Sequence, residues 1–165
     1  MAPGAGSLQD IHIRGIRAKV NDAEKYNDEE RAAHNYSPYA SSITGFPGHY
    51  VERVYVRDVE IEILGGFPAG TEEDSRRPIP ENSKNYPENR MFGVLPAYAF
   101  YVRHARDVHL SDIRIAMRRQ DARPAFVLDD VHDSTFNAVR VRGAAPTSPF
   151  RMEKNCTGVK VTTEP

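Results

Sequence analysis

The chain has 165 residues, which one domain with a single core accommodates. Its 22 Lys and Arg residues nearly cancel its 23 Asp and Glu residues, so it lacks the basic excess that favours binding to nucleic acid or an anionic membrane. A single cysteine, Cys156, excludes an internal disulfide and a cysteine-based zinc site, and the sequence predicts no cofactor and no metal.

The first seven residues predict a disordered lead-in to the first strand. They lack the basic segment and the apolar run of a signal peptide. Elsewhere, no apolar run approaches the roughly 18 residues needed to cross a bilayer, so no membrane partner is predicted. The sequence leaves the cellular compartment open.

Strand-like segments recur with one spacing: apolar, any, apolar, two polar or small residues, then apolar, any, apolar. Alternation of this kind in β-branched residues predicts a strand, a bend and a second strand. Five copies are present, the last one partial, and their first positions are Ile11, Val54, Val108, Ser134 and Val159.

The later copies have the period of a β-solenoid coil. Ser134 follows Val108 by 26 residues, and Val159 follows Ser134 by 25. A phenylalanine precedes four of the copies by eight or nine residues and predicts a shared register: Phe46, Phe100, Phe126 and Phe150. A β-sandwich does not require such an ordered repeat, and a leucine-rich repeat requires a consensus that is missing.

Two insertions explain the longer spacings between the first three copies. They cover residues 22–40 and 65–96, and the first contains the only helix-like stretch, Asp22–His34. The predicted fold is therefore all-β, a parallel β-helix of about five coils in one domain over residues 8–165. The first coil is expected to expose the top of the core, because no cap precedes Ile11.

Several segments resemble the C-terminal coils of bacterial polygalacturonase-like proteins, family 28 of the glycoside hydrolases. They are Ser41–Tyr50, Ile79–Glu81, Asn85–Glu88, Met91–His104 and Asp121–Asp130. The resemblance covers roughly residues 8–161 and implies a pectate-lyase-like, right-handed parallel β-helix. It also implies pectic polysaccharide, a galacturonan-like chain, as a partner.

The resemblance does not extend to the family's catalytic motifs. Its Asn-Thr-Asp, Asp-Asp, Gly-His-Gly and Arg-Ile-Lys motifs have no counterpart here in a matching context. Gly48-His49 lacks the second glycine, and Asp129-Asp130 follows its strand instead of preceding it. We therefore predict no catalytic residue, a structural or substrate-binding role, and a partner in upstream β-helix coils of the same or a split protein. The alternative is a non-catalytic β-solenoid binding or structural module.

Outward positions that follow the four phenylalanines of the repeat supply substrate-binding candidates. The third residues after them are His49, Arg103, Asp129 and Glu153, and Tyr101 lies one residue after Phe100. In the resembled family this face carries the sugar-binding cleft. Asp129 and Glu153 fit either a carboxylate pair or a charge ladder, with Arg103 beside Asp129 and either Arg151 or Lys154 beside Glu153, and the ladder is preferred.

The second insertion contains five prolines, which prevent strand pairing. Its Tyr86 and Arg90 complete the substrate-binding candidates, because an aromatic ring stacks on sugars and a guanidinium pairs with uronates. The preferred interpretation is structural: Met91, Phe92 and Leu95 pin the insertion onto the coils.

The remaining charged side chains are predicted to face solvent. His104, His109 and His132 have no metal-ligand spacing and are expected at exposed strand positions. Arg123, close to Asp121, is expected on a charge-balanced surface and not in a polyanion site.

Overall fold

The computed structural model describes residues 6–20, 39–67, 76–84, 89–143 and 148–164. Residues 1–5 of the lead-in, the helix-like stretch Asp22–His34 and Tyr86 lie outside these ranges. The elements are β1 (Leu8–Val20), β2 (Ser41–Thr44), β3 (Val51–Ile63), the 3-10 helix η2 (Asn89–Phe92), β4 (Phe100–Met117), β5 (Phe126–His132), β6 (Thr135–Arg142), β7 (Phe150–Met152) and β8 (Lys160–Thr163).

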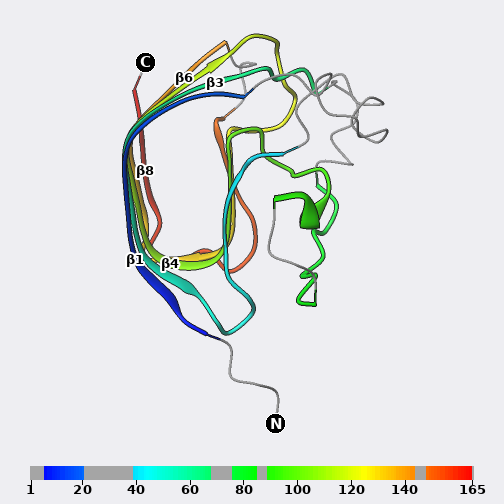
Figure 1. The fold of residues 1–165 in the computed structure, drawn as a ribbon, viewed down its shortest axis with the longest axis vertical. Coiled ribbons are helices and arrows are strands. Elements are labelled where there is room, and N and C mark those ends of the chain that lie inside the picture. The colour runs from blue at the N-terminus through cyan, green and yellow to red at the C-terminus, as the bar shows by residue number, and fades with distance from the viewer. Residues whose placement is uncertain (1–5, 21–38, 68–75, 85–88, 144–147, 165) are drawn as a thin grey trace.

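The strands form an all-β structure in which all paired strands run parallel. One row of pairings joins β1, β3, β4, β6 and β8, and a second joins β2, β4, β5 and β7. Figure 1 looks along the stack, and successive segments of chain overlie one another around the same bent path. This arrangement is consistent with a β-solenoid.

The predicted repeat matches the observed register. Val54 pairs with Ile11 on one side and with Val108 on the other. The offset of 26 residues brings Leu110 opposite Phe136, and the offset of 25 brings Phe136 opposite Val161. The sequence period is therefore the stacking period.

The predicted register of the phenylalanines is correct for Phe100, Phe126 and Phe150 and wrong for Phe46. Phe126 pairs with Phe100 and Phe150, whereas Ser41 occupies the position opposite Phe100. Phe46 instead closes a tight turn in which its backbone exchanges hydrogen bonds of 2.9 and 2.8 Å with His49. Gly45 immediately precedes the turn, and a Cβ at this position would lie 2.5 Å from the His104 carbonyl oxygen.

The long strands bend where the backbone adopts positive φ. One row of such residues stacks through all five layers: Asp10, Arg53, Asp107, Asp133 and Gly158. A second row contains Gly15, Asp58, Asp112 and Ala138. Asp and Gly are among the residues that tolerate this conformation best, so the polar pair inside each repeat becomes a bend.

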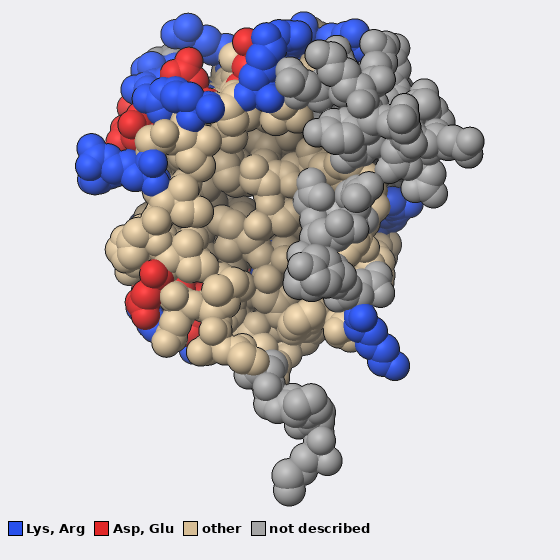
Figure 2. Space-filling view, viewed as in Figure 1, with Lys and Arg blue, Asp and Glu red and all other residues tan. Residues whose placement is uncertain are grey.

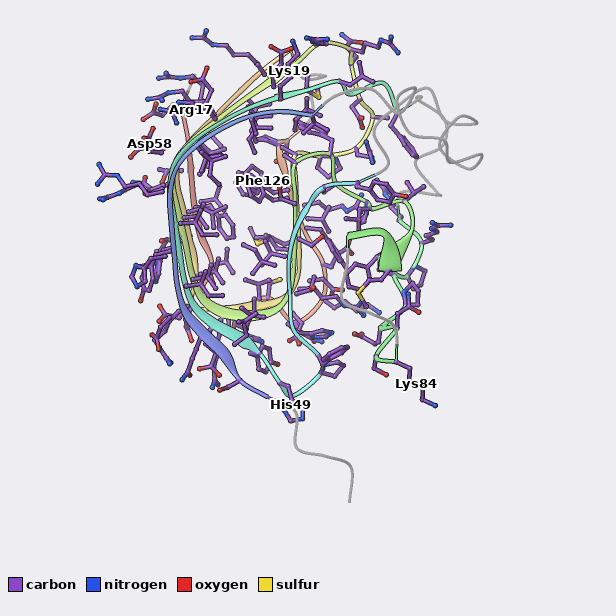
Figure 3. All side chains as sticks on the ribbon, viewed as in Figure 1. Arg17, Lys19, His49, Asp58, Lys84 and Phe126 are labelled. Carbon is purple, nitrogen blue, oxygen red and sulfur yellow. The ribbon has the colours of Figure 1, made fainter. Side chains whose placement is uncertain are left out.

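Inward-facing apolar residues of successive layers form one core. Phe126 stacks between Phe100 and Phe150, with ring centroids 5.1 and 4.4 Å away, and Figure 3 shows Phe126 inside the bent strands. Ser134 takes an inward position in the fourth repeat, where its hydroxyl donates to the His132 carbonyl and accepts from the Val108 amide. Both hydrogen bonds offset the cost of burying this hydroxyl.

A second apolar cluster attaches the insertion to the outside of the sheet. Phe92 and Leu95 are buried against Tyr101 and Val127, and Met91 packs on the same cluster. Figure 1 shows this segment, in green, outside the stacked strands. The prediction that these side chains pin the insertion is confirmed.

Arg123 and Asp121 form a fully buried ion pair, so the prediction of an exposed surface is wrong for both residues. Arg123 donates to both carboxylate oxygens of Asp121 at 2.9 Å and to the Leu95 carbonyl at 3.1 Å. The backbone amide of Phe67 also donates to Asp121. The pair is buried because both ends of the insertion converge on it.

Candidate functional site

Polar side chains gather where β4 and β5 bend beside the insertion. Arg103 pairs with Asp129 in the parallel register, and the next residues, His104 and Asp130, both have positive φ. Because the two layers bend at the same step, their polar side chains meet at one edge. The group is called the carboxylate–histidine cluster below; its members are Tyr50, Glu81, Arg103, His104, Asp129, Asp130 and His132.

Arg103 holds the insertion and the neighbouring layer together. Its Nη1 donates to the Ile79 carbonyl at 2.9 Å, and its Nη2 forms an ion pair with Glu81. Its Nε lies 3.4 Å from Asp129 Oδ2, which is an ion-pair distance, but this nitrogen makes no hydrogen bond. The Arg103 side chain is only 10% exposed, while Asp129 and Glu81 are 31% and 35% exposed. Two reachable carboxylates therefore flank one buried cation.

His104 lies between two carboxylates. Its Nδ1 is 2.6 Å from Asp130 Oδ2, and its Nε2 is 3.1 Å from Glu81 Oε1. Each ring nitrogen therefore lies within hydrogen-bond distance of a different carboxylate, one from the next layer and one from the insertion. The prediction that His104 faces solvent is wrong: it is buried because the Glu81 segment covers the bend.

Asp130 collects donors from three parts of the chain. Besides His104, it accepts from the Tyr50 hydroxyl at 3.1 Å and contacts His132 Nε2 at 2.9 Å. Burial alone would raise the pKa of Asp130, but the hydrogen bonds from His104, His132 and Tyr50 outweigh burial and lower this pKa. Asp130 is therefore a firmly ionised carboxylate.

Asp129 has the opposite electrostatic environment. Burial raises the pKa of its carboxyl above the ordinary value, and the charge of Arg103 opposes that rise. The Tyr101 hydroxyl approaches Asp129 Oδ2 at 3.5 Å, and burial also raises the pKa of Tyr101. Two adjacent aspartates thus have pKa values displaced in opposite directions.

The structure brings three of the predicted substrate-binding residues together: Tyr101, Arg103 and Asp129. Tyr101 is buried beneath the insertion, so its ring is not open on the sheet face as expected. The predicted ladder position of His49 is wrong, because Thr44 pairs with Arg103, and Figure 3 shows His49 at the outer end of its turn. Arg90 lies in η2, and Tyr86 lies outside the described residues.

The preferred charge ladder is confirmed. Arg103 lies beside Asp129, and Arg151 Nε lies 2.7 Å from Glu153 Oε1. Each of the two carboxylates therefore has its own cationic neighbour: Arg103 comes from the layer next to Asp129, and Arg151 comes from the same layer as Glu153.

Five members of the cluster were missed as site residues: Tyr50, Glu81, His104, Asp130 and His132. The repeat offset of 26 places His104 directly beside Asp130, so this contact was within reach of the sequence. Glu81 gave no such signal, because it lies in an insertion outside the repeat. His132 is part of an Asp-x-His motif that also occurs at Asp107 and His109.

Both Asp-x-His motifs extend to a threonine of the next layer. His109 lies 2.6 Å from Asp107 and 2.6 Å from Thr135, and His132 lies 2.9 Å from Asp130 and 2.8 Å from Thr157. The two motifs lie at different bends, since Asp130 aligns with His104 and His132 with Arg106. Each forms a structural link between layers, with the carboxylate and the hydroxyl fixing the imidazole.

The site is a polar cluster of three carboxylates, one arginine, two histidines and a tyrosine on an all-β protein of stacked parallel strands. Within the described residues, no group of three His, Cys, Asp or Glu side chains has the geometry to hold a metal ion. The described part of the chain also contains no helix with the length and apolarity of a membrane span. Comparison with protein-family models, curated proteins and solved structures gives no significant match.

Proposed function

We propose that this chain is part of a right-handed parallel β-helix of polygalacturonase-like lineage and that it binds pectic polysaccharide without cleaving it. The resemblance of residues 41–50, 79–104 and 121–130 supports the lineage, and the parallel stacking of bent strands supports the β-helix. The observation that carries the binding role is the pair of partly exposed carboxylates, Asp129 and Glu81, fixed by the buried Arg103.

Fixed carboxylates suit the recognition of sugar hydroxyls. A hydroxyl donates to a carboxylate, and hydrogen bonds to charged groups stabilise a complex by about 1.5–3 kcal/mol. Arg103 and His104 already hold the carboxylates in place, so little side-chain entropy is lost on binding. Arg106, whose guanidinium lies 5.6 Å from the Tyr50 ring centroid, forms an ion pair with Glu52 at the edge of the cluster, and its half-exposed side chain is available to a uronate carboxylate.

The same contacts argue against turnover. Hydrolysis with inversion needs one carboxylic acid and one carboxylate free to activate water. In the cluster, Glu81 contacts Arg103 and His104, and Asp130 contacts His104, His132 and Tyr50. These carboxylates serve as hydrogen-bond acceptors within the fold, and no residue is assigned a catalytic role.

Titration of the full chain with trigalacturonate, followed by NMR chemical shifts, tests the proposal. We expect saturable shifts near Asp129 and Glu81, and Asp129→Asn should weaken binding roughly 10-fold or more, because one charged acceptor is lost. Asp107→Asn is the matched control, since Asp107 occupies an exposed bend away from the cluster. Release of reducing ends would refute the non-catalytic role, and shifts that respond equally to both variants would refute the site.

A purely structural module is the second candidate. It is favoured by the burial of Tyr101 and Val127, because the insertion occupies part of the outward sheet face on which a sugar cleft was expected. Absence of any shift at about 10 mM trigalacturonate, a concentration above most weak protein–sugar dissociation constants, would select this candidate.

A further inference from the structure

β1 forms an open end of the stack. Among the described strands it pairs with β3 alone, so its other edge presents backbone N–H and C=O groups without a strand partner. An edge of this kind is a template for another parallel strand. At 13 residues, β1 is also long enough to direct such pairing.

The core side of β1 is exposed where the next layer is buried. Leu8, Ile13 and Val20 are 57%, 41% and 38% exposed, while their partners on β3 are between 2% and 4% exposed. Figure 2 looks onto the end of the stack and shows an uncharged central area with charged side chains on its rim. The inward row of β1 therefore lacks the covering layer that β4 gives to β3.

Three outward side chains of β1 are basic: Arg14, Arg17 and Lys19. Arg14 lies beside Arg57, another cation, whereas Arg17 and Lys19 lie beside Glu60 and Glu62. Arg17 forms a 2.8 Å ion pair with Asp58 and lies 3.5 Å from Glu60, and Lys19 lies 3.4 Å from Glu62. Both cations nevertheless stay about half exposed. Figure 3 shows Arg17 and Lys19 on the outside of the bent strand. A neighbour on the free edge would meet three cations in succession.

Two further features restrict what can pair with this edge. β1 bends at Asp10 and Gly15, which have φ values of 60° and 74°, so a straight strand cannot follow it. His12 stacks on Tyr55 with ring centroids 4.8 Å apart, and its opposite face is exposed. A matching strand needs residues that tolerate positive φ at the two bends and gains from an aromatic ring beside His12.

We propose that the free edge of β1 docks a further parallel β-helix coil with apolar inward residues and acidic outward residues opposite Arg17 and Lys19. This inference rests on the stacking and charge of β1 and does not depend on sugar binding. Opposite charges on adjacent strands stabilise pairing, and like charges oppose it. The occupant is thus defined by chemistry: the pattern of β3, with Glu60 and Glu62, is the pattern that already pairs with β1 on its other side.

Two other occupants fit less well. A second copy stacked head-to-tail would bring β8 onto this end, and β8 spans four residues against 13 in β1. A dissolved polyanion could contact the cations, but it would leave the exposed Leu8, Ile13 and Val20 uncovered.

A pair of 13-residue peptides provides the test. The acidic probe has the sequence of residues 51–63 with Arg57→Glu, and the basic control has the same sequence with Glu60→Lys and Glu62→Lys in place of that change. Hydrogen exchange of the full chain is measured with each peptide. We expect the acidic probe to slow exchange of the β1 amides and to bind about 3- to 30-fold more tightly than the control.

A charge swap makes the test reciprocal. The double variant Arg17→Glu, Lys19→Glu should prefer the basic peptide, while exchange of the β4 amides stays unchanged and shows that the fold is intact. Equal protection by both peptides, or none, would overturn the proposal. So would protection of β1 that rises with protein concentration alone, which indicates a second copy, or protection by trigalacturonate, which indicates a polyanion. None of these readouts depends on the Asp129 site.

Discussion

The end strand β1 and the interior strand β4 follow the same sequence pattern in different surroundings. Ile13 on β1 and Leu110 on β4 face the core from equivalent positions, two layers apart through Val56. Ile13 is 41% exposed and Leu110 is fully buried. Their bends are also equivalent, with positive φ at Gly15 in β1 and at Asp112 in β4.

The difference shows that conformation and burial have separate origins in this fold. The local pattern of apolar and polar residues determines where a strand runs and where it bends. Neighbouring layers determine how much each apolar side chain contributes, because a repeat of this kind contacts only the layers beside it. Residues at equivalent positions of the repeat should therefore contribute different amounts to the free energy of unfolding.

The largest expected effect comes from the interior ion pair. Arg123→Met should lower the free energy of unfolding by about 3–5 kcal/mol, because it leaves the fully buried Asp121 carboxylate unpaired. The control is Arg17→Met, which removes an exposed pair with Asp58 and should have a far smaller effect. Urea unfolding measures both. Similar losses for the two variants would contradict the contrast between interior and end.

Truncation of the matched core residues tests the comparison directly. Leu110→Ala should lower the free energy of unfolding by about 2–5 kcal/mol, because it opens a cavity between covered layers. Ile13→Ala removes side-chain atoms that are already partly in water, so its cost should be less than half as large. Equal costs in urea unfolding would mean that another layer covers β1 in solution.

The second row of positive-φ residues, from Gly15 to Ala138, allows two substitutions that should change the free energy of unfolding in opposite directions. Ala138 has a φ of 51°, so Ala138→Gly should stabilise the protein by roughly 0.5–1 kcal/mol after the entropic cost of glycine. Gly15→Ala should destabilise it by about 1–2 kcal/mol, although an added Cβ meets no atom within 4 Å. Thermal unfolding measures both, and a destabilising Ala138→Gly would show that the bend carries no strain.

The smallest expected effects are changes of stability with pH. The pKa of Asp130 is lowered in the folded state, so its contribution is present above the ordinary Asp pKa of about 3.9 and is lost as the pH falls through the lowered value. Asp130→Asn should therefore lower the unfolding midpoint at pH 7, and the difference from the unaltered protein should shrink as acid protonates the native Asp130.

Asp129 should show the reverse sign. Its pKa is raised in the folded state, so the folded protein loses stability as the pH rises from about 3.9 through the raised value. Asp129→Asn should raise the urea midpoint at pH 7 relative to Asp130→Asn. At the exposed bend of β1, Asp10→Asn serves as the solvent-screened control. A midpoint lowered equally by all three would contradict the opposed environments.

The candidate site was only partly predictable, for a reason visible in particular residues. Arg103 and Asp129 were found because they occupy the same position in successive repeats. His104 was placed in solvent, because the sequence does not reveal that Glu81 folds back over its bend. His49 was misplaced, because a four-residue turn beginning at Phe46 has the same length in sequence as a short strand.

The sequence alone determined the stacking offsets of 26 and 25, the inward rows and the pinning role of Phe92 and Leu95. These follow from local alternation and from a repeated length, which the sequence contains in full. Tertiary structure alone decided that Arg123 and Asp121 are buried, that His104 bridges two carboxylates and that the insertion covers Tyr101. Each of these depends on which segments come together in space, and a side chain's charge, burial and partners change with that contact.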